Sequence, residues 1–131
     1  MVIDTSALVA VLLGDASAPG LAAAIEAASS RLLSAANLLE TAMVVESRKG
    51  EAAGRDLDLL LYRAAIEVVP VDHDQAEIAR TAWRQFGKGR HPAGLNYGDC
   101  FAYALAKARQ MPLLFSGDDF ARTDIEPALR S

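Results

Sequence analysis

The sequence predicts an α/β fold in which a central parallel sheet of about four to five short strands carries helices on both faces. Short apolar runs of strand length alternate along the chain with longer Ala- and Leu-rich segments of helical length. Apolar residues make up 52 % of the 131 residues, which is enough to bury a substantial core. No linker or internal repeat interrupts this alternation, so we expect one domain over residues 1–131.

Local signals define each element in chain order. Thr5 or Ser6 can cap a helix that Gly14 ends, and Pro19 opens the next one. Asp72 and Gln75 have the spacing of a capping box before a further helix. The predicted strands are 2–3, 31–34, 67–71 and 112–115, with a final short one near 124–126. The predicted helices are 5–13, about 20–28, 35–49, 51–65, the segment after Asp72 that carries an apolar face from Ile78 to Phe86, and 97–109.

Charge and cysteine content exclude several classes of protein. The net charge of −4 excludes a molecule that is basic overall, so any nucleic-acid contact must come from a local patch. The single Cys100 excludes an internal disulfide, and with only two histidines a closed Cys/His zinc site is not expected. This composition fits a reducing, cytoplasmic setting. We expect no signal peptide, because Asp4 and no Lys or Arg precedes the first apolar run, and no membrane span, because that run ends at Leu13.

Acidic residues recur where predicted strands end or helices begin, and one lies inside an apolar helix. The carboxyl ends of parallel strands meet at one edge of a sheet, so these side chains are expected to converge there. Converging carboxylates repel one another unless a cation lies between them, and Mg²⁺ or Mn²⁺ is the cation that such oxygen ligands favour. The acids are Asp4, Glu40, Asp99 and the neighbours Asp118 and Asp119.

Helix capping is the alternative interpretation of these acids. Asp is common at the N-cap and in the first turn of a helix, and Asp4, Asp99 and Asp119 can each be explained in that way. Glu40 cannot, because it lies within helix 35–49, where a carboxylate is costly to bury without a partner unless it extends into solvent. The four positions together favour a metal site.

With these motifs in order, the chain resembles the PIN-domain ribonucleases, and specifically the VapC-type toxins of bacterial toxin–antitoxin pairs. The resemblance rests on Val2 to Leu8, Glu40, Gly98-Asp99 and Leu113 to Phe120, and it spans essentially the whole chain. It implies a PIN-like fold and a Mg²⁺-dependent endoribonuclease, with Mn²⁺ able to substitute, that cleaves structured RNA such as tRNA or rRNA. It also implies a homodimer that a small VapB-type antitoxin neutralises in a hetero-oligomer.

Matching the family's motif assigns four catalytic acids: Asp4, Glu40, Asp99 and Asp119. Asp4 and Asp99 are expected to bind the metal directly, with Glu40 and Asp119 holding waters or a second ion. The fourth acid rests on a Gly-x-Asp-Phe ending, and Asp118 is the alternative.

A basic stretch precedes Asp99. No acidic residue lies between Glu77 and Asp99, whereas Arg84, Lys88 and Arg90 fall there, and we expect these three to contact RNA phosphates. The alternative is a solvated helix face followed by a mobile loop over 87–95. Trp83 is expected in the core or at a dimer interface.

Other proteins with an Asp at the end of the first strand fit less well. A haloacid-dehalogenase-like phosphatase needs a second Asp two residues later, where this chain has Ser6, and a response-regulator receiver needs an acidic pair there. A non-enzymatic alternative is a catalytically degenerate PIN domain that serves as a protein- or RNA-binding module. The presence of all four acids argues against that alternative.

Overall fold

Four short parallel strands form the centre of the molecule in the order β3-β2-β1-β4. A computed structural model describes residues 1–129, and the last two residues of the predicted domain lie outside that range. The strands are β1 (Val2–Ile3), β2 (Leu32–Ser34), β3 (Glu67–Val69) and β4 (Leu113–Leu114). The helices are α1 (Thr5–Leu13), α2 (Ala18–Ala27), α3 (Ala35–Lys49), α4 (Glu51–Arg63), α5 (His73–Phe86), α6 (Tyr97–Arg109) and the short 3₁₀ helix η1 (Phe120–Arg122).

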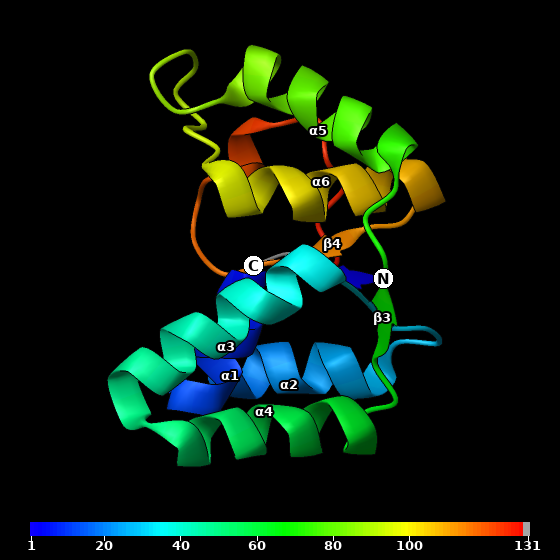
Figure 1. Ribbon diagram of the computed structural model, residues 1–131. Helices are drawn as coiled ribbons and strands as arrows, with labels where there is room; N and C mark the ends of the chain where they lie inside the picture. Colours follow the sequence, from blue (N-terminus) through cyan, green and yellow to red (C-terminus); the bar gives the residue numbers. More distant parts are fainter. Residues whose placement is uncertain (130–131) are drawn as a thin grey trace.

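Helices cover both faces of the sheet, as the sequence predicts. Neighbouring strand residues point to opposite faces, so each two-residue strand contributes to two cores. Val2, Leu32 and Leu113 pack with α5 and α6. Ile3, Leu33 and Leu114 pack with α1, α2 and α4. Figure 1 shows α5 and α6 together on one side of the strands, with α1, α2 and α4 on the other.

The strand near 124–126 is reduced to one bridge, so the expectation of a fifth strand is not met within residues 1–129. Leu113 bridges Pro127 in parallel, with its N–H donating to the Glu126 carbonyl at 2.9 Å and its carbonyl accepting from the Ala128 N–H at 2.9 Å. Pro127 has no N–H to extend the ladder. The segment still lies along β4, and this brings η1 beside α6.

The segment over 87–95 is a loop, as expected, and backbone contacts close it. Gly87 bridges Leu95, and the Lys88 N–H donates to the Leu95 carbonyl at 2.9 Å. Within the loop, the Ala93 N–H donates to the His91 ring nitrogen Nδ1 at 3.0 Å. The loop therefore leads from α5 to α6 along a defined path.

No single helix within residues 1–129 is long and apolar enough to cross a membrane. Only α1 and α2 taken together have the length and composition, and they bend by 118° where they meet.

Candidate functional site

Asp4 lies at the end of β1, where its N–H donates to the Leu114 carbonyl of β4 at 2.9 Å. It is the N-cap of α1, and its Oδ2 accepts a hydrogen bond from the Ser6 N–H at 2.9 Å. The expectation that Thr5 or Ser6 caps this helix is therefore wrong. The residue is only 2 % exposed, and its Oδ1 is buried without a hydrogen-bond partner. Burial raises the pKa of Asp4 to about 6, against hydrogen bonds from Ser6 that lower it, and the charge of Glu40 adds to the rise.

Asp99 occupies the third position of α6, in a capping box with Asn96. The Asp99 N–H donates to Asn96 Oδ1 at 2.9 Å, and the Asn96 N–H donates back to Asp99 Oδ2 at 3.1 Å. Burial raises the pKa of Asp99 to about 7, and the next contribution is the charge of Asp4. The charges of Asp119 and Glu40 add to this rise, and the hydrogen bond from Asn96 opposes it. Capping and convergence with other acids therefore coexist in this residue.

Glu40 projects from α3 against the first turn of α6. Its Oε1 accepts a hydrogen bond from Asn37 Nδ2 at 3.1 Å. The carboxylate lies so close to Gly98 that a Cβ on that residue would overlap it. Gly98 thus creates the space that lets Glu40 lie beside Asp99 at the start of α6.

Asp119 lies in the loop after β4, and its charge acts on Asp99. Ser6 fixes the start of this loop, because its Oγ accepts the Ser116 N–H at 2.9 Å. Asp119 is exposed and makes no capping hydrogen bond from its side chain. Its negative charge nevertheless contributes to the pKa rise of Asp99, and this coupling favours Asp119 over Asp118 as the fourth acid.

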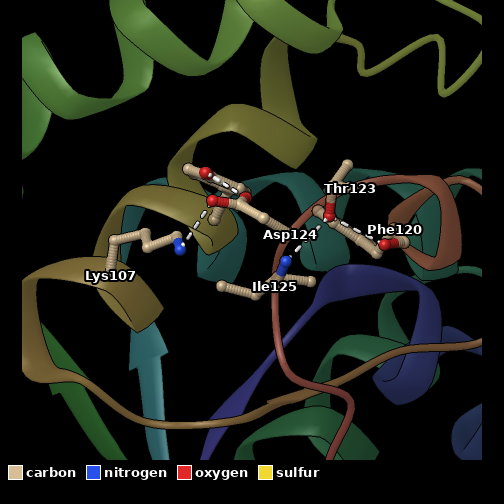
Figure 2. Close-up of polar contacts among 6 residues, drawn as sticks. Lys107, Phe120, Thr123, Asp124 and Ile125 are labelled. Atoms are coloured by element: carbon tan, nitrogen blue, oxygen red, sulfur yellow. Dashed lines mark hydrogen bonds and ion pairs between the residues drawn. The ribbon is translucent and has the colours of Figure 1, made fainter.

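The segment that carries Asp119 is anchored to α6, the helix that carries Asp99. Asp124 accepts hydrogen bonds from Tyr103 Oη at 2.5 Å and from Lys107 Nζ at 2.9 Å. Figure 2 shows the Lys107–Asp124 contact beside the turn in which Thr123 Oγ1 donates to the Phe120 carbonyl at 2.7 Å. These bonds set where η1 and its preceding acid lie.

The four acids are coupled, yet they do not form a closed cage. In the part of the chain that the structure describes, no three Asp, Glu, His or Cys side chains are close enough to hold a metal ion as they stand. Carboxylates that share a site repel one another when no cation offsets their charge. The residues fit a hard cation for two reasons: their donors are all oxygens, and the buried Asp4 Oδ1 lacks any other partner.

The three basic residues expected to contact RNA are all exposed, and none forms an ion pair within residues 1–129. Arg90 lies with its guanidinium 4.2 Å from the centre of the Trp83 ring. Trp83 is 44 % exposed, so the expectation that it packs in the core is wrong, and a dimer interface remains open. Position 87 accommodates glycine but no larger residue, because a Cβ there would overlap the backbone and ring of Trp83.

A groove of about 570 Å³ connects the basic stretch with the start of α6. Lys88, Trp83 and Asn96, the capping partner of Asp99, are among its lining residues. Arg84 and Arg90 do not line this groove. The structure thus places Lys88, but not Arg84 or Arg90, in the same groove as Asn96.

Two residues of the site were missed from sequence. Gly98 was named only as part of a motif, and its contact with Glu40 exists only once α3 crosses α6, whereas Asn37 contacts Glu40 within α3 itself. The one available signal was the spacing of Asn37 and Glu40, which places both on one face of a helix.

Comparison with known proteins identifies the family. The chain matches the PIN domain over residues 1–126. Ribonuclease VapC30 of Mycobacterium tuberculosis is 60 % identical over 125 residues, which cover 95 % of each chain. Ribonuclease VapC of Mycolicibacterium smegmatis is 58 % identical over 125 residues, covering 95 % of this chain and 97 % of that one. The fold and the matched sequence therefore define a member of the PIN-domain family. Within that family, the chain belongs with the VapC ribonucleases.

Solved structures agree on the fold. The crystal structure of Mycobacterium tuberculosis VapC20, described as a Sarcin-Ricin loop cleaving toxin, superposes with a TM-score of 0.77 at 21 % identity over 95 % of each chain. VapBC2 from Rickettsia felis, solved bound to a promoter DNA fragment, gives a TM-score of 0.71 at 19 % identity, covering 96 % of this chain and 94 % of that one. At these identities the likeness shows the fold alone.

Proposed function

We propose that this VapC-type ribonuclease is the RNA-cleaving toxin of a toxin–antitoxin pair and that it cleaves RNA with Mg²⁺ held by its four coupled acids. The observation that carries the metal is the convergence of Asp4, Glu40, Asp99 and Asp119. The charges of Asp4, Asp119 and Glu40 add to the raised pKa of Asp99, the charge of Glu40 adds to that of Asp4, and Asp4 keeps an unpartnered oxygen. Mn²⁺, which accepts the same oxygen ligands, can substitute.

Asp4 and Asp99 are the proposed direct ligands, because they are the two acids with raised pKa values. Glu40 and Asp119 hold waters or a second ion. When bound, the metal activates a water for attack and offsets negative charge on the scissile phosphate. The protein orients the ligands: Ser6 holds Asp4 through its N–H, and Asn96 holds Asp99 through its own.

The basic stretch supplies the complementary contact to RNA. Arg84, Lys88 and Arg90 are exposed cations on the surface next to the acids, and contacts of this kind bind phosphates without reading sequence. Of the three, Lys88 lines the groove that Asn96, the capping partner of Asp99, also lines. An acidic protein can thus hold RNA through one local basic patch, while the metal offsets the negative charge of the four acids.

The proposed substrates are structured cellular RNAs, tRNA or rRNA, and the proposed place of action is the cytoplasm, where those RNAs are found. The names of relatives that share 60 % and 58 % of their residues with this chain support RNA as the substrate class.

Two kinds of protein partner are proposed: a small VapB-type antitoxin and a second copy of the chain. Exposed apolar side chains support a partner beside the site. Leu39 and Met43 of α3 are 63 % and 62 % exposed, and Tyr97 of α6 is 79 % exposed. All three line a groove of about 390 Å³ that also contains Glu40. A partner seated there would cover apolar surface and lie next to the acids.

The competing function is a degenerate PIN domain that only binds protein or RNA. It is not favoured, because a binding module has no need for four coupled carboxylates, which destabilise the metal-free protein.

RNA-end sequencing after brief expression tests the proposal. Wild type should create new ends at defined positions, and Asp4→Asn should create none, because Asn can still cap α1 but carries no charge. Asp72→Asn is the matched control, since Asp72 caps α5 by accepting the Gln75 N–H at 2.8 Å. Identical RNA ends from wild type and Asp4→Asn would contradict the proposal.

A further inference from the structure

Asn37 is a buried polar residue whose role the four acids do not explain. It is 0 % exposed and lies on α3, one turn before Glu40. Its Nδ2 donates to Glu40 Oε1 at 3.1 Å and to the Gly98 carbonyl at 3.0 Å. Its Oδ1 is buried and accepts no hydrogen bond. A buried amide oxygen without a partner is rare and calls for an explanation, and a missing water or ion is one of the common ones.

The orientation of this amide follows from its partners. Both groups next to Nδ2, a carboxylate oxygen and a backbone carbonyl, can only accept hydrogen bonds when the carboxylate is ionised. Exchanging the two amide atoms would place an oxygen against two acceptors. Oδ1 is therefore the atom left without a partner. Because both atoms share one carbon, Oδ1 lies directly beside the contact with Glu40.

Asn37 also joins the elements that carry the acids. Its backbone carbonyl accepts hydrogen bonds from Thr5 Oγ1 at 3.3 Å and from Thr41 Oγ1 at 2.7 Å. Thr5 follows Asp4, and Gly98 precedes Asp99. One residue thus contacts Glu40 itself and the immediate neighbours of the two proposed metal ligands.

The two residues with orphaned atoms in the described chain are joined through one hydrogen bond of Thr5. In residues 1–129, the buried side-chain oxygens or nitrogens without a partner are Asp4 Oδ1 and Asn37 Oδ1. Asp4 and Asn37 are linked through Thr5. One hydrated cation beside Asp4 would bring water hydrogens that both oxygens lack, since Mg²⁺ keeps several waters in protein sites.

We propose that Asn37 is a positioning residue of the metal site. Its Nδ2 donates to both the Glu40 carboxylate and the Gly98 carbonyl and so fixes the carboxylate beside α6. Its Oδ1 accepts a hydrogen bond from the hydrated ion. This inference rests on the proposed metal-dependent function and adds a residue to it. Partners that orient metal ligands from behind change metal affinity about 10- to 100-fold when they are removed.

Mn²⁺ binding, followed by the electron paramagnetic resonance of the free ion, tests the inference without any RNA. Asn37→Leu keeps a side chain of similar size and removes both amide functions, so its Mn²⁺ Kd should rise about 10- to 100-fold. Asn37→Ser, which is smaller, gives a second variant if leucine prevents folding, and its Kd should also rise. Gln75→Leu is the matched control, because Gln75 carries another buried side-chain amide. The Nε2 of that amide donates to the Pro70 carbonyl rather than to one of the four acids. This variant should lose stability and keep the wild-type Kd.

Nuclear magnetic resonance of the wild type needs no variant. Adding Mg²⁺ should shift the side-chain amide signals of Asn37 with the affinity of the site, and those of Gln75 should stay in place in the same spectrum. Unshifted Asn37 signals at saturating Mg²⁺, or folded Asn37 variants with the wild-type Mn²⁺ Kd, would overturn the inference and leave the metal site intact. A wild type that binds neither ion would instead overturn the proposed metal dependence, and the role of Asn37 with it.

Discussion

Asp99 combines a cap and a charge in one side chain, and a single substitution separates them. Asn at this position can still accept the Asn96 N–H, so the capping box survives in Asp99→Asn. The lost charge removes repulsion from Asp4, Asp119 and Glu40. We expect RNA cleavage to fall about 100-fold or more, while the metal-free protein is as stable as wild type or more so. Melting in a chelator and a cleavage assay check both. A melting temperature well below that of wild type would count against this account.

The raised pKa values of Asp4 and Asp99 predict how the stability of the metal-free protein depends on pH. Both pKa values rise from 3.8, to about 6 and about 7, so the folded state binds more protons than the unfolded state between these limits. The free energy of unfolding should therefore fall as the pH increases through this window. A rise of about two pKa units for Asp4 alone bounds its share at about 3 kcal/mol.

Urea unfolding in a chelator at about pH 5 and about pH 8 measures this dependence. The midpoint should be lower at the higher pH, and saturating Mg²⁺ should restore it there. Asp4→Asn should flatten the difference. A wild-type midpoint that increases with pH would show that the acids are not held in contact.

The crossing of α3 and α6 depends on the absence of a side chain at position 98. In Gly98→Ala the new Cβ overlaps the Glu40 carboxylate, so one of the two helices or the carboxylate must move. We expect a loss of about 1 to 3 kcal/mol in stability together with weaker Mn²⁺ binding. Gly20→Ala in α2 is the control, because its Cβ meets only Leu129 at 3.8 Å and should leave both quantities unharmed. Unchanged Mn²⁺ affinity in Gly98→Ala would contradict a role of Glu40 in metal binding.

The folded loop after α5 makes the basic stretch a defined surface. If Arg84, Lys88 and Arg90 contact phosphates, changing all three to Ala should weaken binding to every RNA tested rather than change which is preferred. The slope of log affinity against log salt should flatten by about two to three units, at roughly 0.7 to 0.9 for each lost contact. Binding is measured in an Asp4→Asn background so that the RNA survives.

A matched triple change provides the control for this slope. Arg48, Lys49 and Arg55 are also exposed, and they lie around the junction of α3 and α4. Their replacement by Ala should leave the salt slope unchanged. Equal slopes for wild type and the first triple variant would mean that RNA is held elsewhere.

At the scale of the whole molecule, a groove between two helices is a candidate binding surface for the antitoxin. A groove of about 470 Å³ lies between α3 and α4, lined by Leu38, Ala42 and Leu57 among others. An amphipathic helix fits such a groove, and an Arg from the same partner would compete with the metal for the acids. The purified complex should therefore bind Mg²⁺ more weakly than the free toxin in calorimetric titration. The same affinity in both forms would exclude inhibition by this route.

Much of the fold could be predicted because its signals are local. Helices over 35–49 and 97–109 have the predicted bounds, since capping groups at their ends act within a turn. Pro19 lies in the first turn of α2, so that helix begins two residues before the predicted start. The loop over 87–95 lies where it was predicted, whereas the expected strand near 124–126 is a single bridge at Pro127 whose partner, Leu113, is distant in sequence. Trp83 is exposed under Arg90, a contact that no periodicity indicates.

The sequence by itself determined the sheet of parallel strands, the two helical layers and the positions of four acids at strand ends, at a helix start and inside a helix. Alternation, caps and breakers act over a few residues, so they can be read along a chain. The tertiary structure decided how these acids meet. It brought the charge of Asp119 to bear on Asp99, made room for Glu40 at Gly98, and left Asn37 Oδ1 unpaired next to Glu40. Asn37 and Gly98, for example, lie 61 positions apart, and the packing of α3 against α6 brings them together.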